Sequence, residues 1–468
     1  MRDMSALTVT PSITPELDPD FVPAALWNRA YRDRVDREPD AVMVELALVR
    51  GDGICYRHHV KVLPPREPYM ALNRLYVERL LKFLLWQKGS ARVFVSGSRD
   101  IAQMLASSYC MGGERAFDAE IFGGRIFPEA FTVEYADPGE LSMAQEPAMA
   151  LGGHLDGCRI GFDLGGSDRK CAALIDGKVV FSEEIPWSPY FEKDPSYHRA
   201  GIQDSLQRAA AHLPRVDAIG GSAAGVYVNN EVRVASLFRG VSPTDFDAQV
   251  RHLFKDLRRA WNDVPFEVVN DGEVTALAGA MSIKDGALLG ISMGTSLAGG
   301  YCDAQGRITS WLNELAFAPV DYRADAPVDE WSGDRGCGVQ YFSQQGVGRL
   351  AAKAGLGFPA SMPLPEQLEQ TQSCLKAGVP AARHIFSTIG RCFGYSLAHY
   401  AEFYDLRHVL ILGRVTSGEG GAIIIDQARH VLLSEFPALA EQFDISMPDE
   451  TMKRHGQAVA AASLPVIP

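Results

Sequence analysis

The sequence predicts an α/β fold of two duplicated half-domains with a cleft between them, preceded by an N-terminal α/β accessory region. The first observation is a strand, a glycine bend at Gly165-Gly166-Ser167 and a second strand, together spanning 160–185. The second is a similar arrangement about 130 residues later, where Gly294-Thr295-Ser296 separates two apolar runs. The third is that strands in both halves end in short polar or glycine-rich segments, where α/β folds bind ligands.

Length and composition restrict the class of protein. The chain has 468 residues, of which 47% are hydrophobic and 22% charged, as in ordinary globular proteins. The formal net charge is -13 and Lys and Arg are not clustered, so we expect no nucleic-acid partner. No apolar run is long enough to span a membrane, and the N-terminus lacks a signal-peptide core. We therefore expect a cytoplasmic protein without a membrane partner; its eight cysteines, which form no CxxC pair, indicate reduced thiols.

Residues 1–156 are expected to form the accessory region. The pattern predicts strands at 41–49 and 54–63, a helix at 69–86, a strand at 91–96, a helix at 101–109 and extended chain over 117–135. This order resembles the order after residue 157, so a degenerate copy of one half-domain is one interpretation. The turn Arg50-Gly51-Asp52-Gly53 lacks the Asp-x-Gly-Gly pattern of the later hairpin, and we favour an unrelated α/β region.

The two half-domains are expected at 157–285 and 286–468. In the first, the strand at 266–269 ends at Asn270-Asp271, and a helix of small residues follows at 273–281. In the second, the strand at 408–412 leads into the glycine-rich stretch 413–421. The closing strand and helix are expected within 443–462, with the C-terminal helix packed back on the first half-domain.

The stretch around the first glycine bend has two interpretations. A glycine bend lets backbone N–H groups point at an anion without interference from a side chain. The nearby acid, Asp163, would assist only if a cation such as Mg²⁺ lay between it and the anion. The alternative is a tight hairpin with an incidental acid, and this stretch alone does not decide between them.

Four motifs, taken together, resemble a known group. In chain order they are Asp-x-Gly-Gly-Ser at 163–167, Asn-Asp at 270–271, Gly-Thr-Ser at 294–296 and Leu-Gly-Arg at 412–414. They resemble the phosphate-1, catalytic, phosphate-2 and adenosine motifs of the actin-like ATPase superfamily. Within it, about 157–468 resembles the ROK family of bacterial glucokinases, related sugar kinases and repressors. The resemblance implies actin-like (ribonuclease H-like) half-domains.

The resemblance also implies an activity and a set of roles. It implies a glucokinase-like, ATP-dependent sugar kinase that transfers the γ-phosphate to a hydroxyl of a hexose or hexose-like substrate. Asp271 would be the general base, although an Asp at this position can instead cap the following helix. Asn270, Glu314 and Gln340 would bind the sugar, and Asp163 would hold Mg²⁺ through water.

The same resemblance implies the nucleotide-binding residues. Contacts to phosphate would come from Gly165, Gly166, Ser167, Gly294, Thr295 and Ser296. Gly413, Gly418 and Gly420 would lie under the adenosine.

The sequence departs from the family at the sugar end. Phe317 stands where the family has the His of its Glu-x-Gly-His segment, and only Cys337 stands where it has several cysteines. A structural zinc site needs four ligands, so we expect no zinc. Gln340 stands where the family has a Glu, so the sequence does not identify the acceptor sugar.

Other functions are compatible with the motifs. One alternative is a non-catalytic regulator that senses a sugar or nucleotide, and another is an ATPase that drives conformational change. The family's repressors carry an N-terminal helix-turn-helix, whereas residues 1–156 contain predicted strands and are not basic. The sequence leaves a homodimer open.

Overall fold

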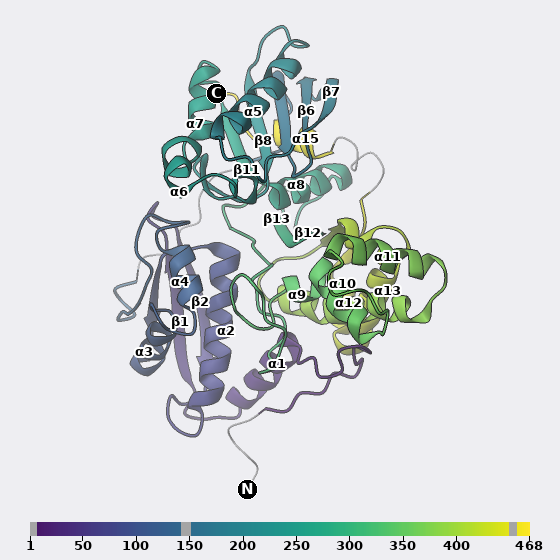
Figure 1. The fold of residues 1–468 in the computed structure, drawn as a ribbon. Coiled ribbons are helices and arrows are strands. Elements are labelled where there is room, and N and C mark those ends of the chain that lie inside the picture. The colour runs from purple at the N-terminus through teal and green to yellow at the C-terminus, as the bar shows by residue number, and fades with distance from the viewer. Residues whose placement is uncertain (1–6, 142–150, 449–455) are drawn as a thin grey trace.

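In a computed structural model, which describes residues 7–141, 151–448 and 456–468, the chain forms three sheets of four or five strands, with flanking helices (Figure 1). We call the sheet at 158–270 with its helices lobe 1, the sheet at 288–446 with its helices lobe 2, and the described residues up to 141 the N-terminal region. Lobe 1 lies at the top of Figure 1, and the other two parts lie side by side beneath it. No helix in the described ranges is long and apolar enough to cross a membrane.

Lobe 1 contains a five-stranded sheet in the order β11-β8-β5-β6-β7. Its strands are β5 (Cys158–Leu164), β6 (Asp168–Ile175), β7 (Lys178–Pro186), β8 (Ala218–Ala223) and β11 (Phe266–Asn270). β5, β6 and β7 run antiparallel, whereas β8 and β11 run parallel to β5. Its helices are α5 (Pro195–Ala210), α6 (Pro243–Asp245) and α7 (Leu253–Ala260), and β9 (Val226–Val228) and β10 (Glu231–Val234) form a separate hairpin.

The C-terminal helix α15 (Gln457–Ala462) packs back on lobe 1, against β5 and β8. Gly161 and Gly220 permit this contact, because a Cβ at either position would overlap a carbonyl oxygen of α15. The apolar side chains of lobe 1 form a core of their own, which includes Phe162, Phe254 and Phe266.

Lobe 2 repeats the strand order of lobe 1. Its sheet is β13-β12-β14-β15, formed by β12 (Leu288–Met293), β13 (Leu297–Cys302), β14 (His408–Leu412) and β15 (Asp444–Ser446). β13 is antiparallel to β12, and β14 and β15 continue in parallel, as β6, β8 and β11 do around β5. The predicted duplication is confirmed. Among the described strands of the lobe 1 sheet, only β7 has no counterpart in the lobe 2 sheet.

Helices cover the lobe 2 sheet. They are α9 (Val339–Phe342), α10 (Gln344–Lys353), α11 (Leu364–Lys376), α12 (Pro380–Tyr400), α13 (Glu419–Glu435) and α14 (Pro437–Ala440). α12 and α13 approach closely at Gly390 and Gly394, where an added Cβ would lie 2.7 Å from a carbonyl oxygen of α13. The helix α8 (Asp271–Ile283) follows β11 and packs on β12 and β13.

The N-terminal region has a different strand pattern. Its strands β1 (Val42–Val49), β2 (Cys55–Val62), β3 (Arg92–Ser96) and β4 (Thr132–Tyr135) pair in the order β2-β1-β3-β4. β3 is antiparallel to β1, whereas the corresponding strands β8 and β14 are parallel to β5 and β12. This direction argues against a degenerate copy of a half-domain.

The helices of the N-terminal region are α1 (Ala24–Val35), α2 (Met70–Lys88), α3 (Arg99–Ser108) and α4 (Ala116–Phe122). The expected extended chain over 117–135 is wrong for its first part, which is α4. There, Asp118, Ile121 and Phe122 are buried at helical spacing, which places them on one face of the helix.

One hydrophobic core joins the N-terminal region to lobe 2. Phe83 of α2 stacks on Phe403 with ring centroids 4.1 Å apart and meets His399 of α12 edge-on at 4.9 Å. The segment before α1 runs along lobe 2, where the buried Asp18 accepts hydrogen bonds from Arg349 (2.6 Å) and Lys353 (2.9 Å). The N-terminal region is therefore packed as part of lobe 2.

Candidate functional site

The carboxyl ends of β5, β8 and β11 place polar groups at one edge of the lobe 1 sheet. The strand register pairs Asp163 with Ser222 and Asn270 with Ala223, so these residues lie next to each other across the parallel strands. Asp163 is buried, and its Oδ1 accepts a hydrogen bond of 2.6 Å from the Ser222 hydroxyl. The sequence did not single out Ser222, because a Ser in a small-residue strand carries no distinguishing pattern.

Asn270 and Asp271 share the start of α8 but differ in their contacts. The Asn270 Oδ1 accepts a 2.7 Å hydrogen bond from the Gly272 N–H, and its Nδ2 donates to the Gly225 carbonyl, also at 2.7 Å. Asn270 is thus the N-cap of the helix. The Asp271 carboxyl accepts only a longer 3.0 Å bond from the same N–H, and this geometry assigns the capping role to Asn270.

Three carboxyl groups at this edge influence one another. Burial, together with the neighbouring charge of Asp163, raises the pKa of Asp271 to about 6. Burial likewise raises the pKa of Glu314 to about 7, with a contribution from Asp271, and raises the pKa of Asp163. A carboxyl group that titrates near neutrality suits proton transfer at physiological pH.

The first glycine bend connects β5 to β6. The Gly165 N–H donates to the Asp168 carbonyl at 2.9 Å, and the Ser167 hydroxyl donates to the Asp168 carboxylate at 2.8 Å. The Tyr190 hydroxyl lies over Gly166, where an added Cβ would overlap it. This bend therefore has a carboxylate and an aromatic side chain beside it.

The second glycine bend connects β12 to β13, and β14 brings the glycine-rich stretch next to it. The Gly294 N–H donates to the Ser296 carbonyl at 2.9 Å, and Thr295 and Ser296 are exposed. Ser292 pairs with Leu412, so Gly413 follows directly beside this bend. Gly413 has a φ of 103°, and a Cβ there would overlap the Met293 carbonyl oxygen.

The other two glycines proposed to lie under adenosine have different surroundings. Gly418 is exposed, with a φ of 66° and open space where a Cβ would lie. Gly420 is buried, and a Cβ there would lie 2.7 Å from the Phe386 ring. Its small size allows α13 to pack on α12, so the structure does not place Gly420 at a ligand-binding surface.

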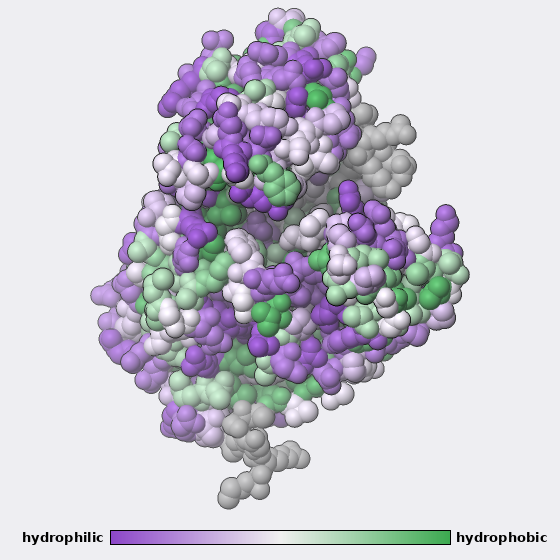
Figure 2. All heavy atoms as spheres, viewed as in Figure 1, coloured by the Kyte–Doolittle hydropathy of each residue, from purple (hydrophilic) through white to green (hydrophobic). Residues whose placement is uncertain are grey.

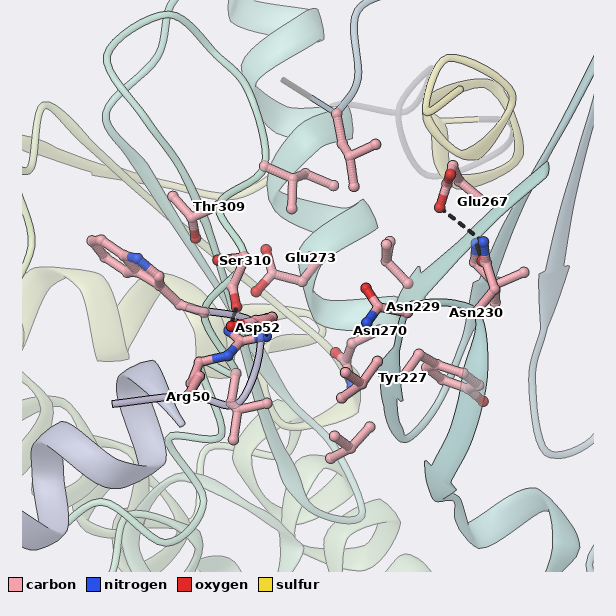
Figure 3. A pocket seen from close by; sticks show the side chains of 18 of the residues that line it. Arg50, Asp52, Tyr227, Asn229, Asn230, Glu267, Asn270, Glu273, Thr309 and Ser310 are labelled. Carbon is pink, nitrogen blue, oxygen red and sulfur yellow. Dashed lines mark hydrogen bonds and ion pairs between the residues drawn. The ribbon is translucent and has the colours of Figure 1, made fainter. Parts of the chain in front are cut away.

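A pocket of about 760 Å³ opens at the carboxyl edge of lobe 1. Most of its lining comes from the turn between β1 and β2, the β9–β10 hairpin, β11 and residues 308–314 of lobe 2 (Figure 3), and single residues of α7 and α8 also contribute. In Figure 2 the surface is hollowed where lobe 1 meets the two parts beneath it. Asn270 and Glu314 line the pocket, whereas Gln340 does not. Gln340 is buried in α9, and its amide donates to Gln345.

Comparisons with known proteins agree with this architecture. No protein-family model and no curated protein matches the sequence. Among solved structures, the ROK hexokinase from Thermus thermophilus is 18% identical, with a TM-score of 0.52 over 66% of this chain and 97% of that chain. A ROK family transcriptional regulator, a homolog of the E. coli MLC protein, is also 18% identical, with a TM-score of 0.51 over 66% and 78% of the two chains.

The chain has the ROK fold. The match covers nearly all of the hexokinase but leaves about a third of this chain outside it. The first 156 of the 468 residues make up that same fraction. The match therefore leaves unmatched a part of the chain as large as the N-terminal region.

The N-terminal region also holds the pocket segment that carries Glu314. The N–H groups of Leu312 and Asn313 donate to the Gln87 carbonyl at 2.9 and 3.0 Å, and that of Glu314 donates to the Trp86 carbonyl at 3.0 Å. These carbonyls lie in the last turn of α2, where they have no partner within the helix. The end of α2 thus fixes the backbone of a proposed sugar-binding residue.

A further carboxyl group in the pocket, Glu273, escaped the sequence analysis. Its carboxylate accepts hydrogen bonds from the Asn313 side chain (2.5 Å) and the Tyr301 N–H (3.4 Å). Burial raises the pKa of Glu273 to about 8. The sequence feature that could have identified Glu273 is its position as an acid in the first turn of a helix made mostly of small, apolar residues.

The position of Phe317 is explained by its neighbours. Its ring lies against Trp86 and Trp331, at centroid distances of 4.3 and 5.1 Å.

Cys337 lies next to a buried ionic cluster. Its buried thiol donates to Asp334, which belongs to that cluster. The cluster consists of Glu78, Arg79, Lys82, Arg115, Asp118 and Asp334. Within the described ranges, no group of three or more His, Cys, Asp or Glu side chains is placed to hold a metal ion.

Proposed function

We propose that the protein is an ATP-dependent sugar kinase that phosphorylates a hydroxyl group of a hexose or hexose-like acceptor. The observation that carries this proposal is the Asp271 carboxyl, which has a pKa of about 6 and is not the N-cap of its helix. It follows directly on Asn270, which lines the pocket, and lies near Asp163, next to the first glycine bend. Asp271 is not itself among the residues that line the pocket, but its position after Asn270 and its raised pKa support its role as the base where the acceptor meets the phosphate.

In the proposed reaction the acceptor lies in the pocket, and its hydroxyl groups bind Asn270 and Glu314. Asp271 takes the proton of the reacting hydroxyl as its oxygen bonds to the γ-phosphorus, and the bond to the ADP oxygen breaks. The two glycine bends provide backbone N–H groups for the phosphates.

The acid next to the first bend fits a cation. Burial raises the pKa of Asp163 despite the Ser222 hydrogen bond and the nearby charge of Lys170, so a further positive charge close to the carboxyl would favour the ionised form. Mg²⁺ held through water by Asp163 would neutralise charge on the phosphates. The residues present therefore fit Mg²⁺ bound with ATP.

The pocket also provides for exclusion of water. It lies between lobe 1 and the joined body of lobe 2 and the N-terminal region, which have separate cores. Closure of these two bodies would exclude water, as transfer to a sugar rather than to water requires.

Turnover measurements on the full chain test the proposal. Coupled ADP release is measured with ATP and Mg²⁺ over hexoses, amino sugars and cyclitols, for wild type, Asp271→Asn and, as a control, Asp426→Asn on the exposed face of α13. Asp271→Asn should lower the rate by about 10²–10⁴-fold, the contribution typical of a general base. The kinase proposal fails if no acceptor raises ADP release above background, or if Asp271→Asn is as active as the control.

One observation favours a second candidate, a non-catalytic regulator that senses a sugar or nucleotide. Asp168 places a carboxylate beside the first glycine bend, and the Tyr190 hydroxyl lies over Gly166, where phosphate would bind. A like charge at this point weakens phosphate binding. A thermal shift with ATP and Mg²⁺, or with a sugar, but without turnover of any acceptor would favour this second function.

A further inference from the structure

The turn between β1 and β2 forms one wall of the pocket. Residues 50–54 line it together with 308–312 of lobe 2, and Figure 3 shows Arg50 and Asp52 across the pocket from Tyr227 and Asn229. The groups proposed to bind the acceptor, Asn270 and Glu314, line the same continuous space. A ligand can therefore contact both sets of residues at once.

The turn is held in place before any ligand binds. Arg50 is only 7% exposed, and its guanidinium donates to the Ser310 carbonyl at 2.8 Å and to the Asp52 carboxylate at 3.0 Å. The other Asp52 oxygen accepts from the Ile54 N–H at 3.3 Å. Because Ser310 belongs to lobe 2, this network fixes the Asp52 carboxylate relative to the acceptor residues.

Two buried polar atoms of this wall have no hydrogen-bond partner among the described residues. They are the Arg50 Nε and the Thr309 hydroxyl oxygen. Because both atoms are buried, a ligand in the pocket does not reach them in this conformation. The group of this wall that a ligand can contact is the part-exposed carboxylate of Asp52, which accepts hydrogen bonds.

The size and charge of the pocket indicate the class of ligand. A volume of about 760 Å³ lies in the upper part of the range for sites that enclose drug-sized ligands, which is more than one hexose ring fills. Its lining contains the acids Asp52, Glu267, Glu273 and Glu314 but only the bases Arg50 and Arg258. Burial raises the pKa of Glu267, Glu273 and Glu314, so these acids add little negative charge near neutral pH. Their carboxyl oxygens can accept hydrogen bonds, so the lining favours a ligand rich in hydroxyl groups.

We propose that the turn at 50–54 forms a second sugar subsite, so that the acceptor is a neutral glycoside of at least two rings, such as a disaccharide. One ring binds at Asn270 and Glu314 with its reacting hydroxyl toward Asp271. The other ring binds at the turn, where Asp52 accepts its hydroxyl protons. This inference rests on the proposed kinase function for the first ring and adds the specificity of the second.

Kinetics on matched acceptors test the subsite. Coupled ADP release is compared for glucose, maltose, cellobiose and an alkyl glucoside with wild type, Asp52→Ala and Asp40→Ala. Asp40→Ala is the control, because Asp40 is an exposed acid just before the start of β1 and forms an ion pair with the exposed Arg66. We expect a disaccharide to have the highest kcat/KM in wild type, and Asp52→Ala to lower it about tenfold, the discrimination a lost hydrogen bond to substrate commonly gives. The kcat/KM for glucose should fall by a smaller factor than that for the disaccharide.

A binding measurement separates this inference from the kinase function. Trp311 lines the pocket, so its fluorescence can report titration with each sugar in the absence of ATP, with Trp311→Phe as the baseline. Disaccharide binding that weakens in Asp52→Ala but not in Asp40→Ala supports the subsite even if no acceptor is phosphorylated. Equal effects of Asp52→Ala on glucose and disaccharides, or tighter binding of glucose than of every disaccharide, would overturn the subsite and leave the kinase proposal intact.

Discussion

The nucleotide end and the acceptor end of the cleft are built from different kinds of segment. The two glycine bends at 165–167 and 294–296 are each formed by one strand pair, and their shape follows from a few consecutive residues. The acceptor pocket brings together the turn at 50–54, the β9–β10 hairpin, β11 and residues 308–314. Local sequence therefore determines one end, whereas tertiary packing determines the other.

The two ends of the cleft should therefore respond differently to amino-acid substitutions. The bends depend on backbone conformation at single glycines, so a point change there acts locally. The acceptor pocket depends on the packing of α2 against lobe 2, so a change far from the pocket can reach it through the backbone of Glu314. Four experiments test this contrast.

The largest effect is expected from the buried ionic cluster that supports the acceptor end. Lys82 is almost fully buried and donates to Asp118 at 2.7 Å, and it lies 3.2 Å from Asp334 of lobe 2. Lys82→Met leaves Asp118 buried without its cation, whereas Asp334 keeps its arginine partners, and it should lower the free energy of unfolding by about 3–5 kcal/mol. Urea denaturation measures this, and Arg66→Met in an exposed ion pair should cost about 0–1 kcal/mol. Similar losses for both variants would contradict the supporting role of the cluster.

A change at the nucleotide end should leave the acceptor end intact. Gly413→Ala forces a side chain into a left-handed conformation and onto the Met293 carbonyl, at a cost of about 1–3 kcal/mol for the strain alone. We expect weaker ADP binding, measured by calorimetry, with unchanged binding of sugar. Gly418→Ala is the control, because it carries backbone strain with open space around the Cβ. If both variants bind ADP equally well, the overlap of the added Cβ with the Met293 carbonyl does not affect nucleotide binding.

The pH dependence of turnover should come from the acceptor end. Asp271 acts as a base only when ionised, and its pKa is about 6. Below that value kcat/KM should fall by about tenfold for each pH unit, and above it kcat/KM should level off. Asp271→Asn provides the comparison, because its residual turnover should lose this dependence on pH. A profile that is flat down to pH 5 would remove Asp271 from the reaction.

The smallest effect is expected from Glu273. Its pKa of about 8 in the folded protein lies well above the value of about 4.3 in an unfolded chain. The folded state therefore holds the extra proton, and the stability that Glu273 contributes is complete below pH 4.3 and is lost as pH rises toward 8. Glu273→Gln does not titrate and keeps an acceptor for Asn313, so it should raise Tm by about 1–3 °C at pH 8 and have no effect near pH 4. A larger gain in Tm near pH 4 than at pH 8 would contradict this direction of the pH dependence.

The sequence predicted the fold and the positions of the bends because both depend on short-range patterns. The repeat of strand, glycine bend and strand at 160–185 and 287–302 was enough to indicate the duplication. The Asn270-Asp271 pair was found in the same way, although its division into a capping residue and a free carboxyl required the hydrogen-bond geometry.

The acceptor end could not be predicted to the same depth. Gln340 was chosen from its place in a motif, but its amide donates a hydrogen bond from α9 to Gln345 of α10. Arg50 and Asp52 gave no signal, because only the packing of the N-terminal region on lobe 2 brings their turn to the pocket. The helix α4 was missed for a similar reason, since tertiary burial of Ile121 and Phe122 decides its conformation.

The core shared by the N-terminal region and lobe 2 has a consequence for synthesis of the protein. Its apolar side chains come from Phe21 to Phe127 and again from Leu289 to Ile445, with the whole core of lobe 1 encoded between them. At about 5–20 residues per second, the ribosome needs roughly ten to thirty seconds to pass from the first group to the second. During that interval the nascent N-terminal region exposes the faces of α1 and α2 that will contact α12. The part of the chain made first therefore waits for lobe 2, and lobe 1 in turn waits for α15 at the end of the chain.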